Sequence, residues 1–230
     1  MRGLSAQALR ITAALSMVID HVGAVFFPEA VWMTAVGRIA YPLFAFLIVE
    51  GAVHTRDWKK YALRLLLLAV ISELPFDWLT LEAGIWTEEA WHIGIFSLVR
   101  QNTVFTLLAG LLVAEAAVRG DARQNPYIGF LAAVAGAGAA WLLQFDYGGA
   151  GVLLIYFFYL FRGSFWLQAL SLGLLSVLAM GGLQVFALAA AVPIFLYSGR
   201  NGRAGRAAQA GMYLFYPLHL IVISMIGALL

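Results

Sequence analysis

The chain has 230 residues, of which 63% are hydrophobic and only 11% are charged, and its mean hydropathy is +0.89. Soluble domains carry about 25% charged residues, so this composition excludes a soluble domain and predicts an integral membrane protein. The absence of cysteine excludes disulfides, thiolate nucleophiles and cysteine-ligated metal centres. The formal charge of +2 does not indicate nucleic-acid binding, because the basic residues are scattered among predicted membrane loops.

Apolar runs along the chain predict its architecture, because a membrane-spanning helix needs about 20 mostly apolar residues. Nine segments fit, so we expect an all-α, polytopic transmembrane bundle that forms a single domain over residues 1–230. The first is interpreted as a retained helix, since no small-residue cleavage site follows it. The predicted segments are 9–27, 36–54, 61–80, 103–118, 127–145, 149–161, 165–181, 183–197 and 211–229.

The basic residues predict the orientation of this bundle. Twelve of the fourteen Lys and Arg residues fall on one side, the exceptions being Arg38 and Arg100. Cytoplasmic loops are enriched in Lys and Arg, so we expect a cytoplasmic N-terminus, an external C-terminus and a place in the inner (cytoplasmic) membrane. The longest polar segment, 81–102, is predicted to be an external interfacial loop or a short amphipathic helix.

Ionisable side chains inside predicted spans are functional candidates, because each costs several kcal/mol in the membrane. Asp20 and His21 lie in the first span, and Arg38 begins the second. Neighbouring helical residues point about 100° apart, so one of the pair Asp20 and His21 orients a neighbouring helix while the other faces a cavity. A purely structural alternative is that Asp20 pairs with Arg38 or Arg64. Pro42 is predicted to kink the second span and free the carbonyl of Arg38.

Further polar groups lie at other depths of the predicted bundle. If they converge, they line a path across the membrane, which suits an enzyme joining a cytosolic donor to an external acceptor and equally a proton-coupled transporter or channel. A non-catalytic assembly subunit is a third possibility. No metal site is expected, because the histidines lie on different elements and no HExxH motif is present. These groups are Glu50, His54, Arg56, Lys60, Arg64, Asn102, Tyr216 and His219.

Short motifs recur in order along nearly all of the chain. They are Asp20-His21, 37–46, Glu50-Gly51, His54-Thr55, Lys60-Tyr61 with Arg64, 73–76, Asn102 with Phe105-Thr106, 147–149 with Gly151, and 216–219. With these motifs the chain resembles the TraX family of membrane proteins. That family is named for a conjugation protein that acetylates the N-terminus of pilin, and it looks distantly similar to membrane acyltransferases that modify polysaccharides.

The resemblance implies an acetyltransferase that uses cytosolic acetyl-CoA. In those relatives a histidine on the first core helix and an arginine on the next support acyl transfer, and these positions correspond to His21 and Arg38. The acceptor, the acyl chain length, the oligomeric state and the choice between His21 and His219 as the base stay open.

The chemistry of the side chains suggests a catalytic role for each candidate residue. A histidine can take a proton from an amine or hydroxyl as it attacks the thioester, and Asp20 or Glu50 can favour the imidazolium that forms. Stabilisation of the oxyanion is expected from Arg38, Asn102 or Tyr216. The phosphates of coenzyme A are expected to bind at His54, Arg56, Lys60 and Arg64. The alternative is that these basic residues only set the orientation of the protein in the membrane.

Overall fold

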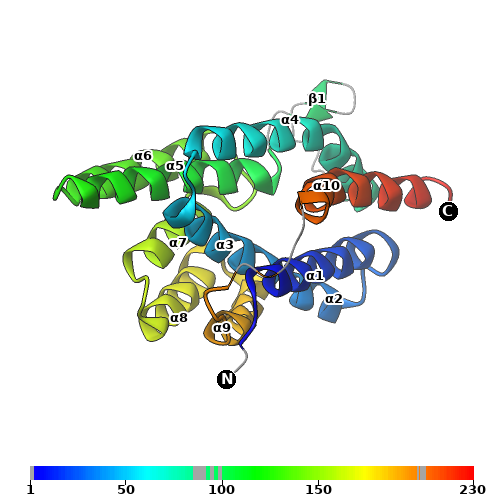
Figure 1. Ribbon diagram of the computed structural model, residues 1–230. Helices are drawn as coiled ribbons and strands as arrows, with labels where there is room; N and C mark the ends of the chain where they lie inside the picture. Colours follow the sequence, from blue (N-terminus) through cyan, green and yellow to red (C-terminus); the bar gives the residue numbers. More distant parts are fainter. Residues whose placement is uncertain (1–2, 85–91, 94–95, 98–99, 201, 203–205) are drawn as a thin grey trace.

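The computed structural model is an all-α bundle, which confirms the predicted fold class (Figure 1). It describes residues 3–84, 92–93, 96–97, 100–200, 202 and 206–230, with 206–210 described through their backbone. The helices are α1 (Ala6–Phe26), α2 (Val31–Gly37), α3 (Ala40–His54), α4 (Trp58–Glu82), α5 (Thr103–Ala122), α6 (Tyr127–Leu142), α7 (Gly148–Leu160), α8 (Phe165–Leu174), the π-helix η1 (Leu175–Met180), the 3-10 helix η2 (Gly182–Ala190), α9 (Ala191–Phe195) and α10 (Arg206–Gly227).

Helix length and surface composition identify a membrane protein. Three helical stretches of the described chain are long and apolar enough to cross a membrane: Ala6–Phe26, Val31–His54 and Thr103–Ala122. Several shorter apolar helices pack beside them. Large apolar side chains such as Leu131 and Trp141 are exposed on the outside of the bundle. So much exposed apolar surface is not found on soluble monomers, and here it faces lipid.

The second predicted span, 36–54, is interrupted near its start, one helical turn before Pro42. The structure ends α2 at Gly37 and begins α3 at Ala40, so the break lies at Arg38 and Ile39. Pro42 occupies the first turn of α3, where a helix does not need its backbone N–H, and because it has no N–H it cannot donate to the carbonyl of Arg38. The break leaves Arg38 between two helices.

Two other regions are less regular than predicted. The predicted spans 165–181 and 183–197 each contain two helix types, and Gly181 and Gly182, at φ +66° and +53°, turn the chain between them. In 81–102, α4 runs on to Glu82 and a short antiparallel pair forms between β1 (His92–Ile93) and β2 (Phe96–Ser97). The predicted amphipathic helix does not appear in the described residues of this segment, and Trp86 and Trp91 lie outside them.

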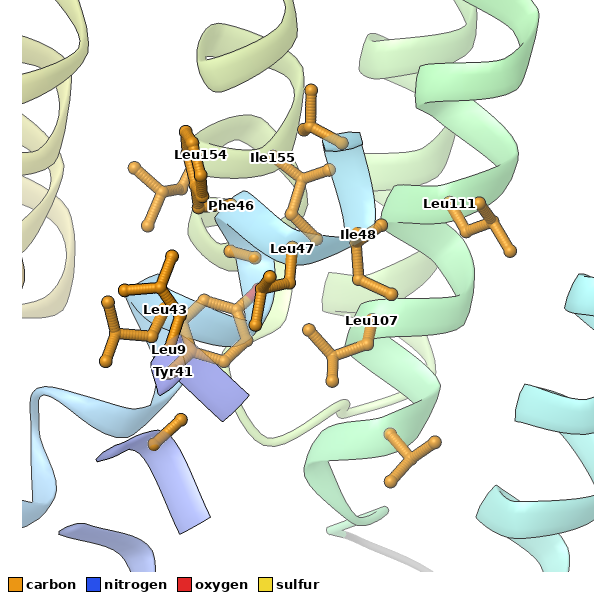
Figure 2. Close-up of a cluster of buried hydrophobic side chains, with 14 of the residues drawn as sticks. Leu9, Tyr41, Leu43, Phe46, Leu47, Ile48, Leu107, Leu111, Leu154 and Ile155 are labelled. Atoms are coloured by element: carbon orange, nitrogen blue, oxygen red, sulfur yellow. The ribbon is translucent and has the colours of Figure 1, made fainter. Parts of the chain in front are cut away.

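Helix α3 is the centre of the bundle because its stretch 40–49 is apolar on every side. It packs against α1, α5, α7 and η2. Figure 2 shows Leu43, Phe46 and Ile48 of α3 among leucine and isoleucine side chains of α5 and α7. A helix buried on all sides holds its two ends in fixed positions, and the residues at its N-terminal end contribute to the site described below.

The start of α5 is fastened to α4 through Asn102. The Asn102 side chain is fully buried; its Oδ1 accepts from the backbone N–H of Val104 at 3.0 Å, which caps α5. Its Nδ2 donates to the carbonyl of Ala69 at 2.8 Å and also to the carboxylate of Glu73. All the polar atoms of this amide therefore serve helix packing.

We predict that Asn102→Ala lowers the free energy of unfolding by about 2–4 kcal/mol, because it removes a helix cap and the buried hydrogen bonds of the amide to Ala69 and Glu73. Asn125 is the matched control: it also accepts a backbone N–H at a helix start, from Tyr127 at 3.2 Å, but it is exposed. Asn125→Ala should cost about 1 kcal/mol or less. Denaturant unfolding in detergent measures both, and equal losses would contradict this account of Asn102.

Candidate functional site

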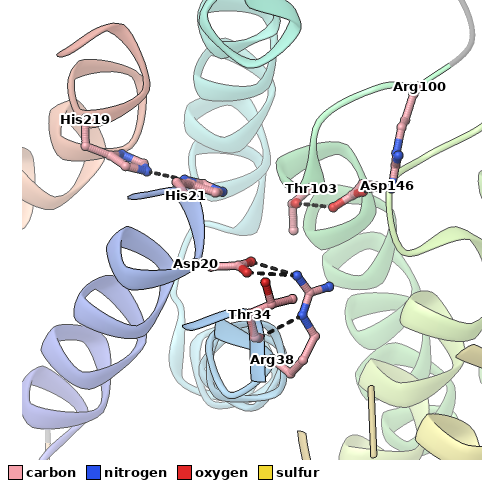
Figure 3. Close-up of polar contacts among 8 residues, drawn as sticks. All are labelled: Asp20, His21, Thr34, Arg38, Arg100, Thr103, Asp146 and His219. Atoms are coloured by element: carbon pink, nitrogen blue, oxygen red, sulfur yellow. Dashed lines mark hydrogen bonds and ion pairs between the residues drawn. The ribbon is translucent and has the colours of Figure 1, made fainter. Parts of the chain in front are cut away.

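A polar cavity of about 210 Å³ lies where α1, the α2–α3 break, α4 and the start of α7 meet. We call it the polar cavity. Figure 3 shows side chains from segments distant in sequence pointing toward one another in this region. Its polar lining residues are Asp20, His21, Thr34, Arg38, Tyr41, Thr80, Arg100, Thr103, Asp146, Tyr147 and Tyr216.

Asp20 and Arg38 form an ion pair on the wall of the polar cavity. Nη2 of Arg38 donates to both carboxylate oxygens, at 2.8 and 3.1 Å, and Nε donates to the carbonyl of Thr34 at 3.3 Å. Gly37 makes this approach possible, since a Cβ there would collide with the Asp20 side chain. Nη1 of Arg38 has no hydrogen-bond partner within the described part of the chain and remains able to donate.

His21 turns away from Asp20 and meets His219 of α10. Nδ1 of His21 lies 2.9 Å from Nε2 of His219, and Nδ1 of His219 lies 2.9 Å from the carbonyl oxygen of Phe215 (Figure 3). The two imidazole planes differ by 8°, so the rings meet through their nitrogen edges in nearly one plane. Neighbouring positions on α1 thus face different partners, as the helical geometry predicts.

A second ion pair lies at the rim of the polar cavity. Asp146 accepts a 2.7 Å hydrogen bond from the Thr103 hydroxyl and lies 3.4 Å from Nη2 of Arg100, whose side chain is 53% exposed. The predicted site residues did not include these three. The sequence signal for Asp146 was its position directly before the 147–149 motif. Asp146 was not assigned to the site because it was predicted to lie in an external loop.

A larger cavity of about 330 Å³ adjoins the polar cavity, and we call it the apolar cavity. At one end it is lined by Arg10 near the start of α1 and by Tyr61 and Arg64 near the start of α4. Its walls are mainly leucine, isoleucine, valine and phenylalanine side chains of α3, α4, α5 and α10. The two cavities share Met17, Phe44, Thr103 and Tyr216 in their linings.

The histidine pair lies beside the junction of the cavities. Met17 lines the apolar cavity one helical turn before His21, and Phe215 lines it one turn before His219. Met17 and Phe215 thus place part of the wall of the apolar cavity one helical turn from each imidazole. His21 itself lines the polar cavity.

Several predicted site residues lie outside both cavities. Glu50 accepts from Nε of Arg162 at 2.8 Å and from the hydroxyl of Tyr197 at 3.3 Å. Asn102 is engaged on α4, as described above. Tyr216 is buried and borders both cavities, whereas Glu50, Asn102 and His219 line neither of them.

The predicted coenzyme A residues are also only partly brought together. Of His54, Arg56, Lys60 and Arg64, Arg64 is the one that lines either of these two cavities, where Arg10 joins it. His54 is 60% exposed and bonds the carbonyl of Glu50. Lys60 pairs with Asp57 at 3.0 Å, and hydrogen bonds from Lys60 lower the pKa of that carboxyl.

Comparison with known proteins agrees with the motifs. The family model described as TraX protein matches residues 5–227. This chain belongs to the TraX family. It is also similar to a protein of Dichelobacter nodosus named "Probable fimbrial assembly protein FimC, serogroup H1", with 28% identity over 240 residues that cover 95% of this chain and 94% of the relative. No solved structure matches this TraX-family chain.

We predict that Asp20 and Arg38 of this TraX-family protein are energetically coupled. Asp20→Asn or Arg38→Gln alone should lower the free energy of unfolding by about 2–4 kcal/mol, because each leaves a mostly buried charge unpaired. The double variant should recover part of the loss, giving a coupling of about 1–3 kcal/mol in a double-mutant cycle in detergent.

The exposed pair of Asp57 and Lys60 is the matched control for that cycle. Solvent screens an exposed pair, so its coupling should be much smaller. A coupling for Asp20 and Arg38 no larger than that of the control would contradict the assigned ion pair.

Proposed function

We propose that this protein is a multi-pass acyltransferase of the inner (cytoplasmic) membrane that transfers an acetyl group from cytosolic acetyl-CoA to an amine or hydroxyl acceptor. The observation that carries the proposal is the position of His21. It lines the polar cavity and lies one helical turn after Met17, which lines both cavities. An enzyme that joins a donor from one side to an acceptor from the other needs a base at such a junction.

The apolar cavity suits the donor. Arg10 and Arg64 at its mouth can bind the phosphates of coenzyme A, and its apolar walls can enclose the pantetheine arm. Both arginines lie at helix ends that the positive-inside pattern assigns to the cytoplasm. The donor site therefore rests on Arg10 and Arg64, with Arg56 and Lys60 on the surrounding basic surface.

The side chains of the polar cavity suit the chemistry of transfer. His21 removes a proton from the acceptor as its nitrogen or oxygen attacks the thioester carbonyl carbon. The oxyanion that forms can accept hydrogen bonds from Nη1 of Arg38 and from the Tyr216 hydroxyl, an effect worth about 3 kcal/mol per donor in enzymes where it has been measured. Asp20 supports this step by holding Arg38 in place.

The acceptor enters through the polar cavity, past Arg100 and Asp146. The name of the Dichelobacter nodosus relative refers to fimbrial assembly. It makes the N-terminus of a fimbrial or pilus subunit the first acceptor to test, with glycans and small amines as the next candidates. A neutral amine must lose a proton as it bonds to the carbonyl carbon, which is consistent with a base on the wall of this cavity.

Two adjoining cavities also fit a second function, a small proton-coupled transporter or channel. Such a protein moves its substrate without consuming a donor. Transport into vesicles that lack acetyl-CoA separates the two functions, because the acyltransferase requires the donor for any product.

The test of the proposal is turnover of radiolabelled acetyl-CoA by the purified protein in lipid nanodiscs. We predict that His21→Ala reduces acetyl transfer and donor hydrolysis by about 100-fold or more while donor binding is retained, because the variant removes a base and leaves the apolar cavity intact. His54→Ala is the control, since this exposed histidine lines neither cavity. Equal turnover in the wild type and His21→Ala would remove His21 from the mechanism.

A further inference from the structure

We infer that His219 is a positioning residue that holds His21 in the Nδ1–H tautomer, so that Nε2 of His21 is the atom that accepts the proton of the acceptor. This inference rests on the proposed acyl transfer for its role in catalysis. Its structural content, the protonation pattern of two histidines, can be measured without any activity.

The pattern is anchored by a backbone carbonyl. The oxygen of Phe215 lies 2.9 Å from Nδ1 of His219, and a carbonyl oxygen can only accept a hydrogen bond. Nδ1 of His219 therefore carries a hydrogen. A neutral imidazole has one N–H, so Nε2 of His219 is left as an acceptor.

The next step follows along the chain of hydrogen bonds. Nε2 of His219 lies 2.9 Å from Nδ1 of His21, and because the first is an acceptor the second must donate. With its hydrogen on Nδ1, neutral His21 carries an unshared electron pair on Nε2. Figure 3 shows this second ring nitrogen on the edge of His21 that faces away from His219. Free histidine favours the other tautomer, so His219 imposes this one.

The geometry keeps the pair fixed. His219 is 8% exposed, and the Phe215 ring stacks on it with centroids 5.0 Å apart and planes 10° apart. The planes of the two imidazoles differ by 8°, which aligns the N–H of one with the in-plane electron pair of the other. A base whose tautomer and ring orientation are set by a partner is the arrangement that acyl-transfer enzymes achieve with an acidic residue.

During acyl transfer one proton passes from the acceptor through His21 to the leaving sulfur. The acceptor N–H or O–H proton moves to Nε2 of His21 as a bond forms between the acceptor atom and the thioester carbonyl carbon. The C–S bond then breaks, and the departing sulfur takes that proton from Nε2, releasing free coenzyme A. His219 keeps its Nδ1 hydrogen throughout and stabilises the transient imidazolium of His21 by accepting from Nδ1.

The tautomer is tested by NMR of ¹⁵N-histidine-labelled protein in nanodiscs, with assignments from single histidine variants. We expect His21 in the wild type to carry its hydrogen on Nδ1 and to lose this preference in His219→Leu. Observation of His21 with its hydrogen on Nε2 in the wild type would overturn the inference. That result would leave the proposed acyltransferase untouched.

Two variants of similar size test the catalytic role. His219→Leu removes the acceptor, whereas His219→Gln can place an amide oxygen near the position of Nε2. We expect His219→Leu to lower kcat by about 100-fold with little change in KM for acetyl-CoA, and His219→Gln to recover at least about 10-fold of that loss. A merely structural residue would give similar losses in both variants.

The outcomes separate the two proposals. Losses in His219→Leu and His219→Gln that are equal, in protein that keeps its wild-type helicity and elution volume, would refute the positioning role. Failure of the wild type to use acetyl-CoA would refute the proposed function instead, while the NMR result would still decide the tautomer.

Discussion

The structure depends on one constraint: a polar side chain inside an apolar bundle must find its partners within the protein, because lipid offers none. Asp20 meets Arg38 and His21 meets His219, so two adjacent residues of α1 tie that helix to the α2–α3 break and to α10. The same contacts that satisfy these groups also surround a cavity. The requirement for partners therefore shapes both the packing of the helices and the candidate site.

The break between α2 and α3 shows how local sequence serves this constraint. Gly37 lets α2 approach the Asp20 side chain, and the end of α2 directly afterwards leaves Arg38 free of a continuous helix. The apolar stretch 40–49 of α3 then fixes the position of the break by packing against α1, α5, α7 and η2. In this way an apolar helix and one glycine place a guanidinium at the wall of the polar cavity.

Hydropathy predicted the helical fold because burial in lipid selects composition over a whole span, and the observed helices lie close to the nine predicted segments. It did not predict the break at Arg38 or the irregular helices near Gly181. The segments on both sides of each break are apolar, so the hydropathy of the span does not show where one helix ends and the next begins. The high cost of charge in lipid singled out Asp20, His21 and Arg38. The same reasoning also selected Asn102 as a site residue. In the structure its amide caps α5 and bonds α4, and these contacts depend on how the two helices pack, which hydropathy does not reveal.

The central claim of the proposed function is that His21 lies beside the junction of two cavities, the apolar one reached from the cytoplasm and the polar one from the exterior. The chain has no cysteine, so single cysteines can report access directly. Gln7→Cys probes the apolar cavity and Thr34→Cys the polar cavity, each treated with an impermeant maleimide from either side of sealed vesicles. The account predicts that Gln7→Cys reacts from the cytoplasmic side and is protected by acetyl-CoA, and that Thr34→Cys reacts from the external side. Reaction of both from the same side would contradict it.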